Sequence, residues 1–216
     1  MKRSTTLTTL ALTTALALVG CGTGAEESTE TAQETAAPAT SSAQATSTTS
    51  ASGEAIATEN NDADVMFAQM MIPHHQQAVD MSETLLAKDD IPADVQDFAQ
   101  KVIDAQGPEI ERMNQMLQTW EAPMSGEDST SMDHGAGGMM SEEDMGMLTD
   151  AQGTDAARLY LEQMTVHHEG AVEMAQEQIE QGQNPQAVEL ARQVVEDQEA
   201  EITEMEQMLQ ELPDGS

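Results

Sequence analysis

The stretch that decides the fold is Phe67-Ala-Gln-Met-Met-Ile-Pro-His74-His75-Gln-Gln-Ala-Val-Asp-Met81, which recurs as Tyr160-Leu-Glu-Gln-Met-Thr-Val-His167-His168-Glu-Gly-Ala-Val-Glu-Met174. Four of the five histidines of the chain lie in these two stretches. On a helix that turns about 100° per residue, apolar residues surround His74 and His167 on one face. Each histidine pair is therefore expected in the core, where a titratable ring needs a hydrogen-bond partner or a ligand.

A second motif follows each histidine pair and carries a glutamate and a glutamine. Gln106-Gly-Pro-Glu109-Ile-Glu-Arg-Met113 matches Gln198-Glu-Ala-Glu201-Ile-Thr-Glu-Met205, at nearly the same spacing from the histidines in both copies. Each copy thus contains two helices, and a lone hairpin cannot bury its apolar face. The repeat predicts an all-α fold, a four-helix bundle made of two helical hairpins packed together.

Capping and breaking residues set the predicted boundaries of the bundle, which spans residues 61–212. Repeat one covers residues 62–120 and repeat two covers 154–211, with Asn61 and Asn184 as helix caps. Residues 121–153 are rich in Gly, Ser, Met and Asp, which predicts a linker. Pro73 conflicts with a regular first helix, because proline costs about 3 kcal/mol in a helix interior. We therefore predict a kink or widened turn just before His74.

The N-terminal segment has the pattern of a targeting sequence. Lys2 and Arg3 precede an apolar run that is too short to span a membrane, so residues 1–20 are predicted to be a signal peptide. Leu18-Val-Gly-Cys21 resembles a bacterial lipobox, which implies cleavage before Cys21 and lipid attachment to its thiol. Residues 21–60 are predicted to be a disordered tether. The domain would then be extracytoplasmic, anchored to the outer face of the cytoplasmic membrane or in the periplasm.

The charge and the cysteine content exclude several kinds of partner and ligand. The formal net charge is −33, which disfavours binding to the nucleic-acid backbone and enriches cations near the surface. The same charge would also simply keep an extracellular protein soluble. Cys21 is the only cysteine, so the folded domain is predicted to lack disulfides and thiolate ligands. No glycine-rich phosphate loop and no informative Ser/His/Asp spacing points to an enzyme.

Histidine and methionine together favour a soft metal ion. Thioether sulfur with imidazole nitrogen suits copper(I), and silver(I) by the same argument, whereas zinc prefers more His or Cys and calcium prefers oxygen. Core histidines that are merely hydrogen-bonded to Glu109 and Glu201 remain an alternative. The possible supporting residues around the histidines are Gln106, Glu109, Gln198 and Glu201. The predicted linker offers further residues for metal capture, namely Met132, His134, Met139, Met140, Met145 and Met147.

Two other functions stay open. Carboxylate-bridged di-metal enzymes on helical bundles use Glu-x-x-His, but Met71 and Met164 stand three residues before His74 and His167. This difference argues against oxygen-activating iron and does not exclude a copper-dependent oxidase. A metal-free protein-interaction module is the third reading.

The string Met70-Met-Ile-Pro-His74-His75-Gln-Gln-Ala78, with the later Gln-x-x-Glu-Ile-x-x-Met and the second histidine pair, resembles the DUF-305 family over about residues 62–211. Members of that family are ferritin-like helical bundles and include periplasmic copper-binding proteins of the CopM type. The resemblance implies copper binding outside the cytoplasm, with a copper-donor or copper-acceptor protein as a possible partner. By matching position, the candidate ligands are His74, His75, Met71, Met81, Met113, His167, His168, Met164, Met174 and Met205.

Overall fold

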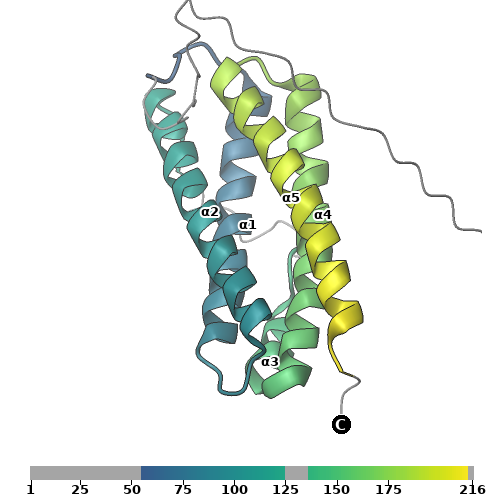
Figure 1. The fold of residues 1–216 in the computed structure, drawn as a ribbon. Helices are drawn as coiled ribbons and strands as arrows, with labels where there is room; N and C mark the ends of the chain where they lie inside the picture. The colour runs from purple at the N-terminus through teal and green to yellow at the C-terminus, as the bar shows by residue number, and fades with distance from the viewer. Residues whose placement is uncertain (1–54, 125–135, 214–216) are drawn as a thin grey trace, which may run out of the picture. The chain divides into compact units, whose positions relative to one another are not determined.

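The computed structural model describes residues 55–124 and 136–213 (Figure 1), and this part of the chain contains helices and no strands. The all-α prediction is confirmed. The elements in chain order are α1 (Asp62–Leu86), α2 (Ala93–Thr119), the 3-10 turn η1 (Ala136–Gly138), α3 (Glu142–Asp150), α4 (Gly153–Gln181) and α5 (Pro185–Glu211). The predicted signal peptide, Cys21, most of the predicted tether, Met132 and His134 lie outside the described residues.

The residues that cap helices in the sequence also cap them in the structure. The Asn61 side chain accepts a hydrogen bond from the Asp64 backbone, and Asp64 returns one from the Asn61 backbone, which forms a capping box at the start of α1. The Asn184 side chain accepts from two backbone N–H groups at the start of α5, where Pro185 occupies the first turn. These local signals fix where the first hairpin begins and where the second one turns.

The four long helices pack as two antiparallel hairpins, α1 with α2 and α4 with α5 (Figure 1). The hairpins meet mainly where α1 runs antiparallel to α4. Buried apolar side chains form two clusters. The α3-end cluster includes Met81, Leu85, Phe98, Leu148, Tyr160, Met164 and Met205. The far-end cluster includes Phe67, Met71, Met113, Leu117, Ala171 and Leu190. Each cluster draws on both hairpins, so neither hairpin has a complete core of its own.

The predicted linker is not a linker throughout, because it contains η1 and α3. Ser141 and Asp144 form a capping box at the start of α3, and Leu148 is fully buried in the α3-end cluster. Met140 and Met145, expected to be exposed linker residues, are partly buried against the same cluster. The linker prediction is therefore wrong for residues 142–150. The polar composition of this segment predicted no helix, but a short one forms and packs against the core through Leu148.

Pro73 does not interrupt α1. Every residue from Asp62 to Leu86 is α-helical, so the widened turn predicted before His74 is not observed. A second proline, Pro108, lies inside α2 directly before Glu109, and no disturbance of the helix was predicted there. Packing of long helices on one another outweighs the local cost of a proline, which explains why both helices continue.

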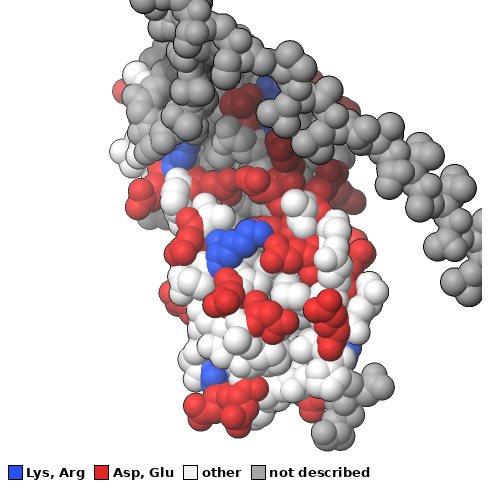
Figure 2. All heavy atoms as spheres, in the orientation of Figure 1, with Lys and Arg blue, Asp and Glu red and all other residues white. Residues whose placement is uncertain are grey.

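The exterior is acidic. Figure 2 shows red Asp and Glu side chains spread over the visible face of the bundle, with few blue Lys and Arg side chains among them. Along the described ranges, no helix is both long and apolar enough to cross a membrane.

Candidate metal centre

All four paired histidines meet at the middle of the bundle. The rings of His74 and His167 lie 3.7 Å apart between centroids, with their planes inclined by 37°. The centroids of His167 and His168 are 6.4 Å apart. At most 2% of each of the four side chains is exposed. The pseudo-twofold relation between the hairpins thus places equivalent residues of the two repeats, His74 and His167, against each other.

Polar side chains form a layer that separates the two apolar clusters. On each long helix, residues on one side of this layer belong to the α3-end cluster and residues on the other side belong to the far-end cluster. The members of the polar layer are His74, His75, Gln106, Glu109, His167, His168, Gln198 and Glu201. The predicted supporting residues therefore lie at the same level of the bundle as the histidines.

Two glutamates orient the second histidine of each pair. His75 Nε2 donates to Glu109 Oε2 at 2.7 Å, and His168 Nε2 donates to Glu201 Oε2 at 2.9 Å. Because an ionised carboxylate only accepts, the proton of each neutral ring must be on Nε2, which leaves a lone pair on Nδ1. Both Nδ1 atoms are buried and have no hydrogen-bond partner within the described residues. This is the arrangement by which carboxylates prepare histidines for metal ions.

The first histidine of each pair also has a free ring nitrogen. His74 Nε2 donates to the Gly137 carbonyl at 2.7 Å, so its lone pair is on Nδ1, which has no partner in the part of the chain described. Neither ring nitrogen of His167 makes a well-formed hydrogen bond within the described residues, although the His74 backbone is close enough to have a small raising effect on the pKa of His167. Leaving a buried polar atom unpaired costs about 1–3 kcal/mol. Several such atoms in one layer favour a ligand-binding site over a structural hydrogen-bond network.

Residues 136–140, the cover segment, lie over His74 and contact two equivalent positions of the repeat. The Gln77 side chain donates to the Met140 carbonyl and accepts from the Met140 N–H. Gly170 is at the position of Gln77 in the second repeat, and a side chain there would overlap the backbone of Gly137. One position therefore holds the cover segment by hydrogen bonds and the other admits it by having no side chain.

Burial lowers the pKa of three imidazoles in the polar layer, those of His74, His167 and His168. Desolvation lowers the pKa of His74 to about 3, against a weaker raising effect of its bond to Gly137. Desolvation and the charge of the neighbouring His74 ring lower the pKa of His167 well below its usual value. Burial also lowers the pKa of His168, although Glu201 opposes the shift. At neutral pH the free lone pairs of these three rings are therefore available to a metal ion.

The same shifts predict how stability depends on pH. The folded-state pKa of His74 lies below its value in the unfolded chain, so the unfolded chain binds more protons and stability falls as pH drops from about 6.5 towards 3. The expected loss is about 1.4 kcal/mol per pH unit for His74, and His167 acts in the same direction. The free energy of unfolding of the metal-free protein can be measured with denaturant at several values between pH 7 and pH 5. It should fall less steeply with decreasing pH in H74N/H167N than in the wild type. Equal slopes in both proteins would contradict this.

The predicted methionine ligands lie on both sides of the polar layer. Met71 and Met113 belong to the far-end cluster, whereas Met81, Met164 and Met205 belong to the α3-end cluster, and all five are fully buried. Met174 is only partly buried and lines a surface groove, unlike Met81 at the equivalent position. Met139 is partly exposed and Met147 is 46% exposed. The structure thus separates Met174 and the predicted linker methionines from the fully buried set.

The sequence around the polar layer is shared with known proteins. Residues 64–209 match the family described as a domain of unknown function (DUF305). The chain belongs to the DUF305 family. A DUF305 fragment from Deinococcus radiodurans is 32% identical, with a TM-score of 0.65 and coverage of 70% of this chain and 98% of that chain. A DUF305 protein from Streptomyces coelicolor is 33% identical, with a TM-score of 0.63 and coverage of 71% and 96%.

CopM is a further structural relative of this DUF305 protein. Its Cu(I)-bound form is 31% identical, with a TM-score of 0.58 and coverage of 68% of this chain and 96% of that chain. CopM has also been solved with Cu(II) and with Ag bound. A search of curated proteins finds no match. The family resemblance inferred from the histidine motifs is confirmed.

Sequence reasoning missed the residues that hold the cover segment. Gln77 and Gly170 stand at the same position of the two repeats, and that difference was the available signal. The Gly137 carbonyl carries no signal in the sequence, because its role depends on how the chain between the repeats folds back onto α4.

Proposed function

We propose that this DUF305 protein binds copper(I) outside the cytoplasm and sequesters it or hands it to another protein. The observation that carries the proposal is the set of buried ring nitrogens in the polar layer, which have lone pairs and no hydrogen-bond partner within the described residues. The solved copper and silver complexes of CopM, about 30% identical to this chain, support the choice of a soft ion.

His74 and His167 are the proposed central ligands, because their rings are adjacent and come from different hairpins. His75 and His168 would contribute through Nδ1, oriented by Glu109 and Glu201. Within residues 55–124 and 136–213, no group of three or more His, Cys, Asp or Glu side chains is arranged to hold an ion. The proposed coordination therefore also needs thioether sulfur from methionines beside the layer. The candidates are Met71, Met113, Met164 and Met205.

This ligand set favours copper(I) over harder ions. Methionine sulfur and neutral imidazole are soft or intermediate donors, and a buried layer disfavours ions that retain water. Thioethers also persist in oxidising compartments where free thiols do not. The chemistry proposed is reversible ligand exchange, and the acidic exterior raises the local concentration of cations.

An extracytoplasmic location forms part of the proposal. The relative from Streptomyces coelicolor carries the description of a secreted protein. The charged start, the apolar run and the lipobox-like Cys21 support a lipid-anchored form of this chain. Labelling cells with a radioactive fatty acid tests the anchor, since the label should be lost in C21S.

Titration of the mature chain with copper(I) tests the metal-binding proposal. The metal-free protein is titrated without oxygen against a chromogenic copper(I) chelator, with zinc(II) as the comparison ion. The protein is expected to withdraw copper(I) from the chelator and to leave zinc(II) with a zinc chelator of matched strength. Copper(I) that stays with its chelator would contradict the proposal and favour a metal-free interaction module.

A further inference from the structure

The two ends of the contact between α1 and α4 are equivalent by pseudosymmetry, but among the described helices only one end has a cover. Helix α3 packs over the end that contains Gln163, whose side chain donates to the Asp144 carbonyl. The residue of the first repeat that is equivalent to Gln163 is Met70, at the other end. No helix in the described part of the chain covers that end as α3 covers its counterpart.

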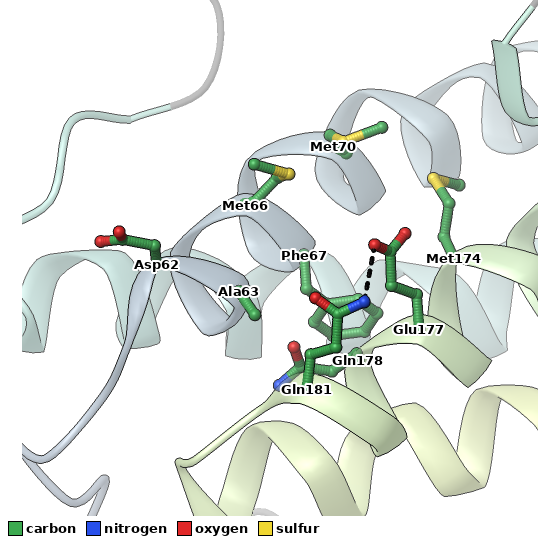
Figure 3. Close-up of a pocket in the computed structure, with 9 residues that line it drawn as sticks. All are labelled: Asp62, Ala63, Met66, Phe67, Met70, Met174, Glu177, Gln178 and Gln181. Carbon is green, nitrogen blue, oxygen red and sulfur yellow. Dashed lines mark hydrogen bonds between the residues drawn. The ribbon is translucent and has the colours of Figure 1, made fainter.

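The uncovered end forms a groove of about 220 Å³ between α1 and α4. Three methionines line it: Met66 and Met70 on α1, and Met174 on α4 (Figure 3). Met66 is 53% exposed, and the other two are partly exposed. The groove therefore presents thioethers from two helices to solvent.

Charge at the groove suits a cation. Asp62 and Glu177 lie among the lining residues, and no Lys or Arg from residues 55–124 or 136–213 lines the groove. The Gln181 side chain donates to Glu177 Oε1 at 3.1 Å, which leaves the carboxylate charge in place (Figure 3). In Figure 3 the Asp62 carboxylate points away from the sulfur atoms, whereas Glu177 lies on the same helix as Met174. One carboxylate near thioethers forms a weak site for hard ions, which prefer several oxygen ligands, and a better one for soft monovalent ions.

We propose that the methionine groove, formed by Met66, Met70 and Met174, is a second, surface site for a soft monovalent cation of the copper(I) and silver(I) class. Its place in the molecule makes it an acquisition site for the polar layer, and this part of the inference rests on the proposed function. Ions would bind first through exchangeable thioethers in the groove and pass from there to the buried imidazoles.

Contacts at the inner end of the groove support transfer of ions from the groove to the polar layer. The Met174 sulfur lies 3.5 Å from the position that a Cβ atom on Gly137 would occupy, so it packs against the cover segment. The Gly137 carbonyl accepts the hydrogen bond of His74. Met174 is thus linked to the polar layer through a single residue of the cover segment.

The test uses silver(I), which does not change oxidation state, and the mature chain labelled with ¹³C at the methionine methyl groups. The methyl resonances of Met66, Met70 and Met174 are expected to shift during titration. M66L/M70L/M174L should bind one equivalent of silver(I) less than the wild type, and leucine preserves the packing volume. The matched control is M116L/M124L/M208L, which changes three methionines that belong neither to the groove nor to the ligands proposed for the polar layer or the predicted linker.

The outcomes separate this inference from the proposed function. In H74A/H167A the groove resonances should still shift, because the groove does not use the histidines. Silver(I) binding that leaves the three groove resonances unchanged would overturn the groove site and leave the polar-layer site standing. Loss of one equivalent in the control variant, with none lost in the groove variant, would also overturn it. Copper(I) held by M66L/M70L/M174L but acquired more slowly would support the acquisition role, and an unchanged rate would refute it.

Discussion

Replacing both His74 and His167 by alanine is expected to lower copper(I) affinity by more than about 100-fold. Loss of a residue that merely orients a metal ligand typically costs about 10–100-fold, and this variant removes two proposed ligands at once. The helices should remain, because the variant also removes buried ring nitrogens that have no hydrogen-bond partner in the part described. Competition with a copper(I) chelator measures the affinity, and circular dichroism measures the helix content.

Ser82 provides a matched control for this variant. Its side chain is buried in α1, away from the polar layer, where the hydroxyl donates to the Ala78 carbonyl and accepts from the Tyr160 hydroxyl. S82A should retain wild-type copper(I) affinity even if it loses stability. If H74A/H167A also retains wild-type affinity, the proposed site in the polar layer is wrong, and the metal is bound elsewhere on the chain.

Replacing Gly170 by alanine is expected to displace the cover segment and to destabilise the protein by about 1–3 kcal/mol. The added methyl group would overlap backbone atoms of Gly137 and Gly138, and backbone cannot rotate away as a flexible side chain can. His74 would then lose its bond to the Gly137 carbonyl and become accessible. Denaturant unfolding measures the stability, and the rate of histidine modification by diethyl pyrocarbonate measures the exposure.

Gly107 is the matched control, since it lies in α2 and a Cβ atom there would meet nothing within 4 Å. G107A should raise the stability by about 0.5–1 kcal/mol, because alanine favours helix more than glycine does. A G170A protein that unfolds and reacts like G107A would show that the cover segment is not held against α4.

The parts of the fold that follow the repeat could be predicted from the sequence. Helical periodicity and the caps at Asn61 and Asn184 gave the positions of the long helices, because these signals are local. The sequence also placed Glu109 and Glu201 among the possible supporting residues around the histidines, and gave hydrogen bonds between these glutamates and the histidines as an alternative to metal binding. The structure places both glutamates at 2.9 Å or less from a histidine nitrogen.

The parts that break the repeat could not be predicted in this way. Helix α3 and the cover segment come from the chain between the hairpins, which has no counterpart elsewhere in the sequence. Their positions depend on single contacts at Leu148 and Gly170, which a periodicity argument does not detect. The repeat predicted the same ligand role for Met81 and Met174. Met81 is buried in the core, however, whereas Met174 lines a groove.

Gln77 and Gly170 occupy equivalent positions of the two repeats, and the difference between them shows an advantage of having both hairpins in one chain. A symmetric dimer of single hairpins would carry the same residue at both positions, either two glutamines or two glycines. Two glutamines would exclude the close approach of Gly137, and two glycines would remove the hydrogen bonds to Met140. Covalent fusion lets the two positions differ, so that a single segment can close one side of a site that is otherwise nearly symmetric.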